Sequence, residues 1–179
     1  VAVSIEEDQA LLLEIRGSLQ LFGGPERIRT LLQQGLHARG HEPVISCTPT
    51  VRGSLWLARA GIECTLLTRD ELRHRLLPVS VEHLAWPAAT MKMLAQMGIR
   101  TLGECARLPR QGFARRLGPA RLHELDQGFG RSPELRRPHV VPEHFVDTLE
   151  LPVETTCVDA LLAGFQRLLS RLGERLKSR

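Results

Sequence analysis

Apolar and polar residues follow one another along this chain with periods that predict secondary structure. An unbroken apolar run from Leu11 to Ile15 is typical of a strand buried on both faces of a sheet. Pro25 suits the first turn of a helix, and apolar residues recur behind it at helical spacing until the chain nears Gly40. Short strands and helices then alternate, and we expect them at 43–48, 55–61, 62–67 and 68–76. This β-α-β-α order predicts an α+β fold in which helices pack against a sheet.

The second half of the chain is predicted to be mainly helical. A helical hairpin is expected around 94–102, and two further helices follow at 108–118 and 121–130. Residues 131–142 hold three prolines and predict an extended linker. Beyond it, alternation over 145–151 predicts a strand, and Thr156 suits the N-cap of an amphipathic helix whose apolar stripe runs to Leu176. We therefore expect four parts, at 1–77, 78–130, 131–142 and 143–179.

Residues 94–102 carry the most specific spacing in the helical part. Apolar residues and one glycine recur in the order that is typical of a helix-hairpin-helix. Gly98 supplies the positive φ that a tight turn between two helices requires. Thr101 suits the N-cap of the second helix, and Glu104 three residues later completes a capping box. We expect the first backbone N–H groups of that helix to lie free and to bind a DNA phosphate without sequence preference. A plain helical corner in an all-α core is the alternative.

The excess positive charge lies around this motif. The chain has 24 basic and 20 acidic side chains, a net charge of +4. Residues 86–137 hold 10 of the basic and 4 of the acidic ones, a net +6, whereas 1–85 and 138–179 each carry −1. A basic segment between near-neutral neighbours is the pattern expected of a nucleic-acid contact, to which Arg100 and Arg110 add ionic groups. By charge alone, a solvated arginine-rich helix surface remains an equal alternative.

Composition limits the other function classes. The four cysteines are scattered, with no Cys-x-x-Cys pair and no His at zinc spacing, so we expect reduced thiols and no metal site. No apolar run approaches the roughly 18 residues of a membrane span, and we expect a cytoplasmic protein without membrane contacts. The chain opens at Val1 with a strand almost at once, which suggests a fragment.

A family resemblance begins near the N-terminus. Residues 9–24 form a hydrophobic strand that runs into a turn with Gly17, Ser18, Leu21, Phe22 and Gly23. This segment resembles the palm of Y-family, lesion-bypass DNA polymerases, in which an acidic pair opens the strand and holds Mg²⁺ for nucleotide transfer. In the family's register the acids fall at Gln9 and Ala10, whose amide and methyl groups do not hold Mg²⁺. The chain is therefore most similar to the ImuB type, the polymerase-like subunits of bacterial mutagenic repair, and the resemblance implies no catalytic residue and no cofactor.

A second register restores both carboxylates. Residues 4–7 are similar to the acidic motif of the family, and this register makes Glu6 and Glu7 the ligands of Mg²⁺. It needs three extra residues before Gly17, about 10 Å along a strand, and an odd shift also turns each side chain to the opposite face. Metal ligands tolerate distance errors of only about 0.2 Å. We therefore expect residues 6–8 to form a solvated acidic turn before the buried strand.

The resemblance continues through the rest of the chain. Residues 108–118 and 121–130 are similar to the last helices of the family's thumb, which grips duplex DNA through its phosphates. Residues 143–179 resemble the opening of the little finger, and the fingers and the first catalytic Asp would precede Val1. Arg59 takes the place of a lysine that lies near the phosphates of the incoming nucleotide. The DNA-binding residues implied by the motif and the resemblance are Gly98, Ile99, Arg100, Thr101, Arg110, Arg115 and Arg116.

Three functions remain open. The resemblance favours a catalytically inactive DNA-binding adaptor of translesion synthesis in the SOS response. Its implied partners are primer-template DNA, an error-prone polymerase, a RecA-like accessory protein and the sliding clamp. The second function is an active polymerase that uses Glu6, Glu7 and Mg²⁺. The third is a non-polymerase repair protein that contains a helix-hairpin-helix, and a palm-type layer before the hairpin argues against it.

Overall fold

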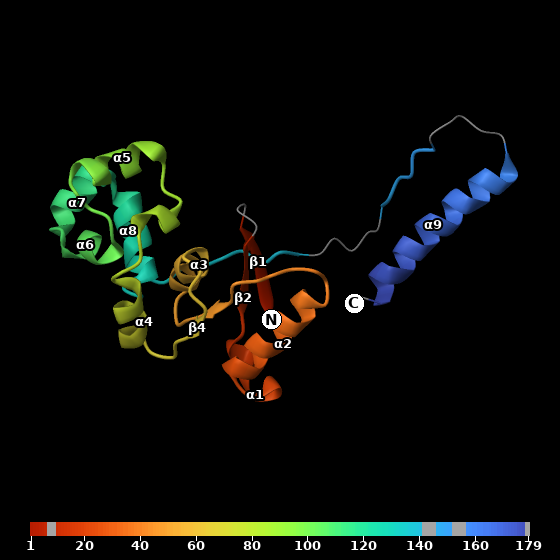
Figure 1. The fold of residues 1–179 in the computed structure, drawn as a ribbon, viewed down its shortest axis with the longest axis horizontal. Coiled ribbons are helices and arrows are strands. Elements are labelled where there is room, and N and C mark those ends of the chain that lie inside the picture. Colours follow the sequence, from red (N-terminus) through yellow and green to blue (C-terminus); the bar gives the residue numbers. More distant parts are fainter. Residues whose placement is uncertain (7–9, 141–145, 152–156, 178–179) are drawn as a thin grey trace. The chain divides into compact units, whose positions relative to one another are not determined.

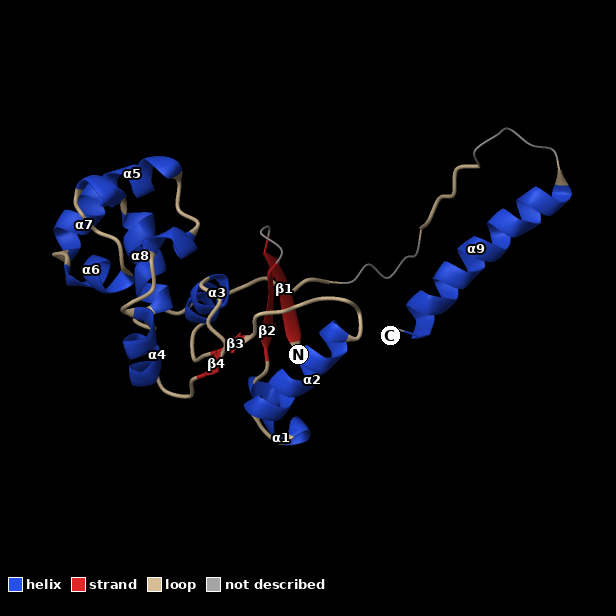
Figure 2. Ribbon diagram, viewed as in Figure 1, coloured by secondary structure: helices blue, strands red, loops and turns tan. Residues whose placement is uncertain are grey.

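The computed structural model describes residues 1–6, 10–140, 146–151 and 157–177. The chain forms two compact units, residues 1–139 and residues 140–179. The first unit combines helices with two small sheets, so the predicted α+β class is confirmed (Figure 1, Figure 2). Its elements in chain order are β1 (Ala2–Glu6), β2 (Ala10–Glu14), η1 (Arg16–Ser18), α1 (Leu19–Phe22), α2 (Pro25–His37), β3 (Ser46–Cys47), α3 (Val51–Arg59), β4 (Cys64–Thr65), α4 (Arg69–Leu76), η2 (Val81–Leu84), α5 (Ala88–Gln96), α6 (Leu102–Arg107), α7 (Arg110–Leu117) and α8 (Pro119–Gly128).

β1 and β2 form an antiparallel hairpin. Ile5 lies opposite Leu11 in the register, so both side chains share one face, and each residue is 57% exposed. α3 packs against β2 and leaves that face open. The prediction of a strand buried on both faces is therefore wrong for β2. Glu6, expected in a solvated turn, is instead the last residue of β1 and is only partly exposed.

β3 and β4 are parallel neighbours joined through α3. Ser46 lies opposite Cys64, and the two strands form a second sheet. Parallel strands need a crossover connection, which α3 supplies. The strand–helix–strand order agrees with the sequence pattern, although both strands are much shorter than the predicted ranges 43–48 and 62–67.

The starts of α3 and α4 use side-chain caps, whereas α2 begins at a proline. α2 begins with Pro25 in its first turn, as predicted. α3 begins after Thr50, whose Oγ1 accepts the N–H of Gly53 at 3.1 Å. α4 begins with a capping box in which Thr68 Oγ1 accepts the N–H of Glu71 at 3.2 Å, while the Glu71 carboxylate accepts the N–H of Thr68 at 3.0 Å. Each cap satisfies an N–H group that has no partner within the helix.

One core joins α3 to the helices that follow Leu77. Trp56 is fully buried, and its ring lies so close to Gly128 in α8 that a Cβ atom there would come within 2.0 Å of Cζ3. Thr50 Oγ1 also donates to the carbonyl oxygen of Gly128 at 2.9 Å. The predicted boundary at residues 77 and 78 lies within this shared core. Its buried residues are Trp56, Leu57, Leu72, Leu76, Val79, Val81, Leu84, Trp86, Leu94, Ile99, Leu102, Cys105, Phe113, Leu117, Leu125 and Phe129.

The helices α5–α8 form two successive helical hairpins. The turn between α5 and α6 contains Gly98 with φ +73°, and the junction of α7 with α8 contains Gly118 with φ +94°. Both values lie in the region that favours glycine. The rings of Trp86 and Phe113 meet edge to face with centroids 6.3 Å apart, which ties the segment before α5 to α7.

In the second unit the described residues form one long helix, α9 (Val158–Lys177). The predicted amphipathic helix is confirmed, and its apolar residues Leu161 and Phe165 are exposed. The prediction of a strand at 145–151 is wrong for residues 146–151, which form none, while Phe145 and Thr156 lie outside the described residues. Among the residues that the structure describes, no helix is long and apolar enough to cross a lipid bilayer.

Gly128→Ala is expected to destabilise the first unit, because the added methyl group overlaps the Trp56 ring. Overpacking of this kind costs about 1–3 kcal/mol, which urea or thermal unfolding measures. Gly112→Ala in α7 is the matched control: its Cβ would meet only Pro109 Cβ, at 4.0 Å, and alanine favours a helix over glycine by about 1 kcal/mol. A Gly128→Ala variant as stable as the wild type would show that α3 and α8 do not pack in this way.

Candidate nucleic-acid interface

The turn between α5 and α6 has the conformation that its spacing predicts. Around Gly98 there is open space where a side chain would begin, Ile99 is buried and Arg100 is exposed. Thr101 Oγ1 accepts the N–H of Glu104 at 3.2 Å, and the Glu104 carboxylate accepts the N–H of Thr101 at 3.0 Å. The predicted capping box is confirmed. The backbone N–H groups of Arg100 and Thr101 lower the pKa of the Glu104 carboxyl, which keeps this cap ionised at neutral pH.

The backbone N–H groups at the start of α6 all have partners within the protein. The N–H of Arg100 donates to Glu104 at 2.6 Å, beside that of Thr101. The N–H groups of the next two residues, Leu102 and Gly103, donate at 2.9 Å to the carbonyl oxygens of Val79 and Leu77 respectively. The prediction that these groups lie free for a phosphate is therefore wrong, because the Glu104 carboxylate and the segment that precedes α5 accept their hydrogen bonds.

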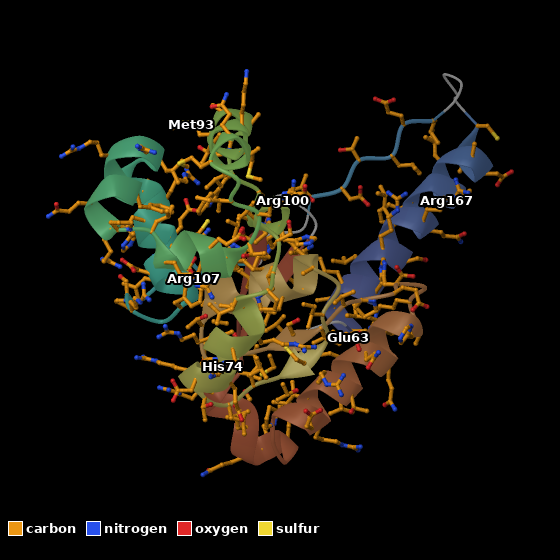
Figure 3. All side chains as sticks on the ribbon, turned by 60° about the vertical axis from the view of Figure 1, so that its left-hand side comes forward. Glu63, His74, Met93, Arg100, Arg107 and Arg167 are labelled. Atoms are coloured by element: carbon orange, nitrogen blue, oxygen red, sulfur yellow. The ribbon has the colours of Figure 1, made fainter. Side chains whose placement is uncertain are left out.

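Positive charge beside the turn comes from side chains. Arg100 directly precedes the N-cap of α6 and Arg107 ends that helix (Figure 3). Arg116, exposed in the last turn of α7, reaches the turn from another helix: its NH1 lies 3.6 Å from Sδ of Met97. Arg115, also predicted to bind DNA, is exposed beside it. Arg116 thus reaches the turn that Arg100 follows, and a contact of either residue with DNA stays a prediction.

Arg110, predicted to bind DNA, has a partner within the protein. Its NH1 and NH2 donate to the two carboxylate oxygens of Asp126 at 2.7 and 2.6 Å. This bidentate pair joins the first turn of α7 to the last part of α8. Arg110 lowers the pKa of the largely buried Asp126 carboxyl, and Arg131 adds a weaker contact at 3.6 Å. Arg110 therefore holds the second helical hairpin together, and its contact with DNA stays a prediction.

The candidate metal positions lie at the end of the hairpin where the chain passes from β1 to β2. Glu6 is the register partner of Ala10, and its carboxylate forms an ion pair with Arg136. Gln9 and Glu7 lie outside the described residues. Among the described residues, no group of three or more His, Cys, Asp or Glu side chains is placed to hold a metal ion. Of the two carboxylates that the shifted register makes ligands of Mg²⁺, the described one, Glu6, is paired with a guanidinium group.

An open polar cleft of about 390 Å³ lies beside Glu6. Its walls come from β1, α3, η2 and α8, and three arginines line it: Arg52, Arg59 and Arg121. Glu124 lines it as well. Of the residues that line this cleft, the sequence indicates only Arg59 as a functional residue, because it takes the place of a lysine in the polymerase family. The other arginines and Arg136 escape sequence reasoning, because no local motif links residues so far apart in the chain.

Two curated proteins are similar to this chain. Protein ImuB of Caulobacter vibrioides strain NA1000 / CB15N is 31% identical over 141 residues, and ImuB of strain ATCC 19089 matches to the same extent. The alignment covers 76% of this chain and 31% of each relative, so the chain spans about a third of their length. No family model and no solved structure matches the chain. The similarity supports the ImuB-like relationship that the sequence motifs indicate.

Asp126→Asn is expected to destabilise the first unit by about 1–3 kcal/mol at neutral pH, because a mostly buried carboxylate that accepts charged hydrogen bonds is lost. The folded protein lowers the pKa of Asp126, so this stabilisation is present above the unfolded value of about 3.9 and is lost as the pH falls through the folded value. Urea unfolding of both proteins from neutral to acidic pH measures the difference. A difference that stays constant to the lowest pH would contradict an ionised Asp126.

Proposed function

We propose that this chain is part of an ImuB-type, Y-family polymerase-like protein that binds DNA without copying it. The observation that carries the proposal is the end of the hairpin where the chain passes from β1 to β2, at which Glu6 lies opposite Ala10 in the register and is paired with Arg136. Nucleotide transfer with two metal ions needs several carboxylate oxygens at one place. Here a guanidinium group already engages the single described carboxylate. The similarity to protein ImuB supports the same conclusion.

We assign residues 1–77 to a palm, 78–130 to a thumb and 143–179 to the opening of a little finger. The antiparallel hairpin followed by the β3–α3–β4 crossover supports the palm. The two helical hairpins of α5–α8 support the thumb. The amphipathic helix α9 supports the third assignment.

The proposed DNA contact is made by arginine side chains around a turn with a defined shape. Gly98 and Ile99 shape the turn, and the Thr101 cap fixes the start of α6. Arg100 and Arg116 then supply the charge for a phosphate. Contacts of this kind do not distinguish bases, which suits a protein that acts on damaged templates of any sequence.

The proposed role is that of an adaptor in translesion synthesis and the SOS response. A palm that does not catalyse nucleotide transfer can still recruit a partner enzyme to DNA. The partners that we propose, from the resemblance to ImuB-type proteins, are an error-prone polymerase, a RecA-like accessory protein and the sliding clamp. This chain spans about a third of the length of its relatives. We therefore propose the contacts with these partners for the whole protein.

Arg100→Gln combined with Arg116→Gln is expected to weaken binding to duplex DNA and to lower the slope of log affinity against log salt by about 0.9 for each lost phosphate contact. Fluorescence anisotropy with a labelled duplex at several salt concentrations measures both quantities. Arg27→Gln with Arg73→Gln, two exposed arginines of α2 and α4, removes the same charge as a control. Equal losses in the two double variants would place the contact elsewhere. A marked preference for one base sequence would argue against a phosphate contact.

The full-length protein is expected to bind primer-template DNA and to extend no primer with Mg²⁺ or Mn²⁺. A gel-based extension assay tests this, with an active lesion-bypass polymerase as positive control. The Glu6→Ala/Glu7→Ala variant is assayed beside it and should behave as the unmodified protein does. Primer extension that this double substitution abolishes would establish the alternative, an active polymerase in the shifted register.

A further inference from the structure

The segment that follows α8 lies on β1. The N–H of His139 donates to the carbonyl oxygen of Val3 at 2.6 Å. The hydroxyl group of Ser4 donates to the carbonyl oxygen of Arg137 at 3.0 Å. We call residues 131–139 the strap. Sequence composition predicts an extended linker here. In the structure this segment instead hydrogen-bonds to β1, which also pairs with β2.

Arg136 fastens the strap to the end of the hairpin. Its guanidinium group pairs with Glu6 and also donates from Nε and NH2 to one oxygen of Glu134, at 2.9 and 2.7 Å. The side chain of Glu134 is only 7% exposed, and those of Glu6 and Arg136 are 18% and 24% exposed. Burial lowers the pKa of the Arg136 guanidinium, because it removes the charge from water. The guanidinium therefore occupies the place between two acids where a cation would bind.

The ion pairs continue from the strap into α3 and α8. Glu134 also forms an ion pair with NH2 of Arg52 at 3.0 Å, and NH1 of Arg52 lies 3.8 Å from a carboxylate oxygen of Glu124. Glu124 pairs with Arg121 at 2.6 Å and accepts the indole N–H of Trp86 at 2.7 Å. Three carboxylates and three guanidinium groups thus alternate, which leaves the chain of ion pairs neutral. It links the strap to the same helices that share the Trp56 core.

We propose that residues 131–139 are a latch, in which Arg136 replaces a metal ion at the end of the hairpin and holds the strap on β1. While the latch is closed, Glu6 is not available to a divalent cation, and the backbone of β1 is covered along the strap. Covering the backbone of a strand in this way keeps it from pairing with other chains. The replacement of a metal ion rests on the proposed palm, whereas the latch shares no residue with the proposed DNA contact and can be tested apart from it.

Hydrogen exchange tests the latch in the 179-residue chain without added metal. In Arg136→Met the His139 amide is expected to exchange at least tenfold faster than in the wild type. The Ile99 amide, which bonds Leu94 inside the core, reports on global unfolding and is expected to stay unchanged. Arg137→Met is the matched control, since its exposed side chain is the neighbour of Arg136 and the Ser4 bond uses only its backbone. Equal His139 exchange in the two variants would overturn the latch.

A second variant covers the case in which Arg136→Met loosens the whole unit. Glu6→Gln removes one ion pair and keeps the shape of the side chain, and it too is expected to speed His139 exchange and leave Ile99 unchanged. In the wild type, millimolar Mn²⁺ is expected to broaden the NMR signals of Glu6 no more than those of the exposed Glu42. Stronger broadening at Glu6 would show that its carboxylate is open to a cation and would refute the replacement by Arg136.

Discussion

The first unit depends on the close packing of the Trp56 ring against the backbone of Gly128. The ring is fully buried, and only a residue without a side chain allows α8 to approach α3 so closely. Since α3 is also the crossover between β3 and β4, this contact joins the sheet layer to the helical hairpins. The hydroxyl group of Thr50 caps α3 and also donates a hydrogen bond to the carbonyl oxygen of Gly128. This one side chain therefore joins the start of α3 to the end of α8.

The core shared by α3 and the later helices determines which groups at the candidate interface can bind a phosphate. The segment between α4 and α5 lies against the start of α6 and takes up the N–H groups of Leu102 and Gly103. A phosphate at this turn therefore has to be bound by side chains, and Arg100 and Arg116 are the ones beside it. Arginine side chains adapt to a backbone of any sequence, which is consistent with the proposed role on damaged templates.

Ion pairs occupy the end of the hairpin where the chain passes from β1 to β2. Arg136 comes from a segment that is far from Glu6 in sequence, and it brings Glu134 with it. A buried guanidinium between two carboxylates is stable only when both acids remain, since removal of one partner leaves a charge without compensation. The same neutral series of charges reaches Arg52 and Glu124, so electrostatics and apolar packing join the same helices.

By itself the sequence determined the features that depend on near neighbours. The positive φ at Gly98, the capping box of Thr101 and Glu104, and the start of α2 at Pro25 all follow from residues within a few positions. Tertiary structure alone decided the open face of β2, the occupied N–H groups of α6, and the partners of Arg110 and Glu6. Each of these depends on which distant segment arrives beside it. Tertiary packing brings these segments together, and no local pattern of residues encodes it.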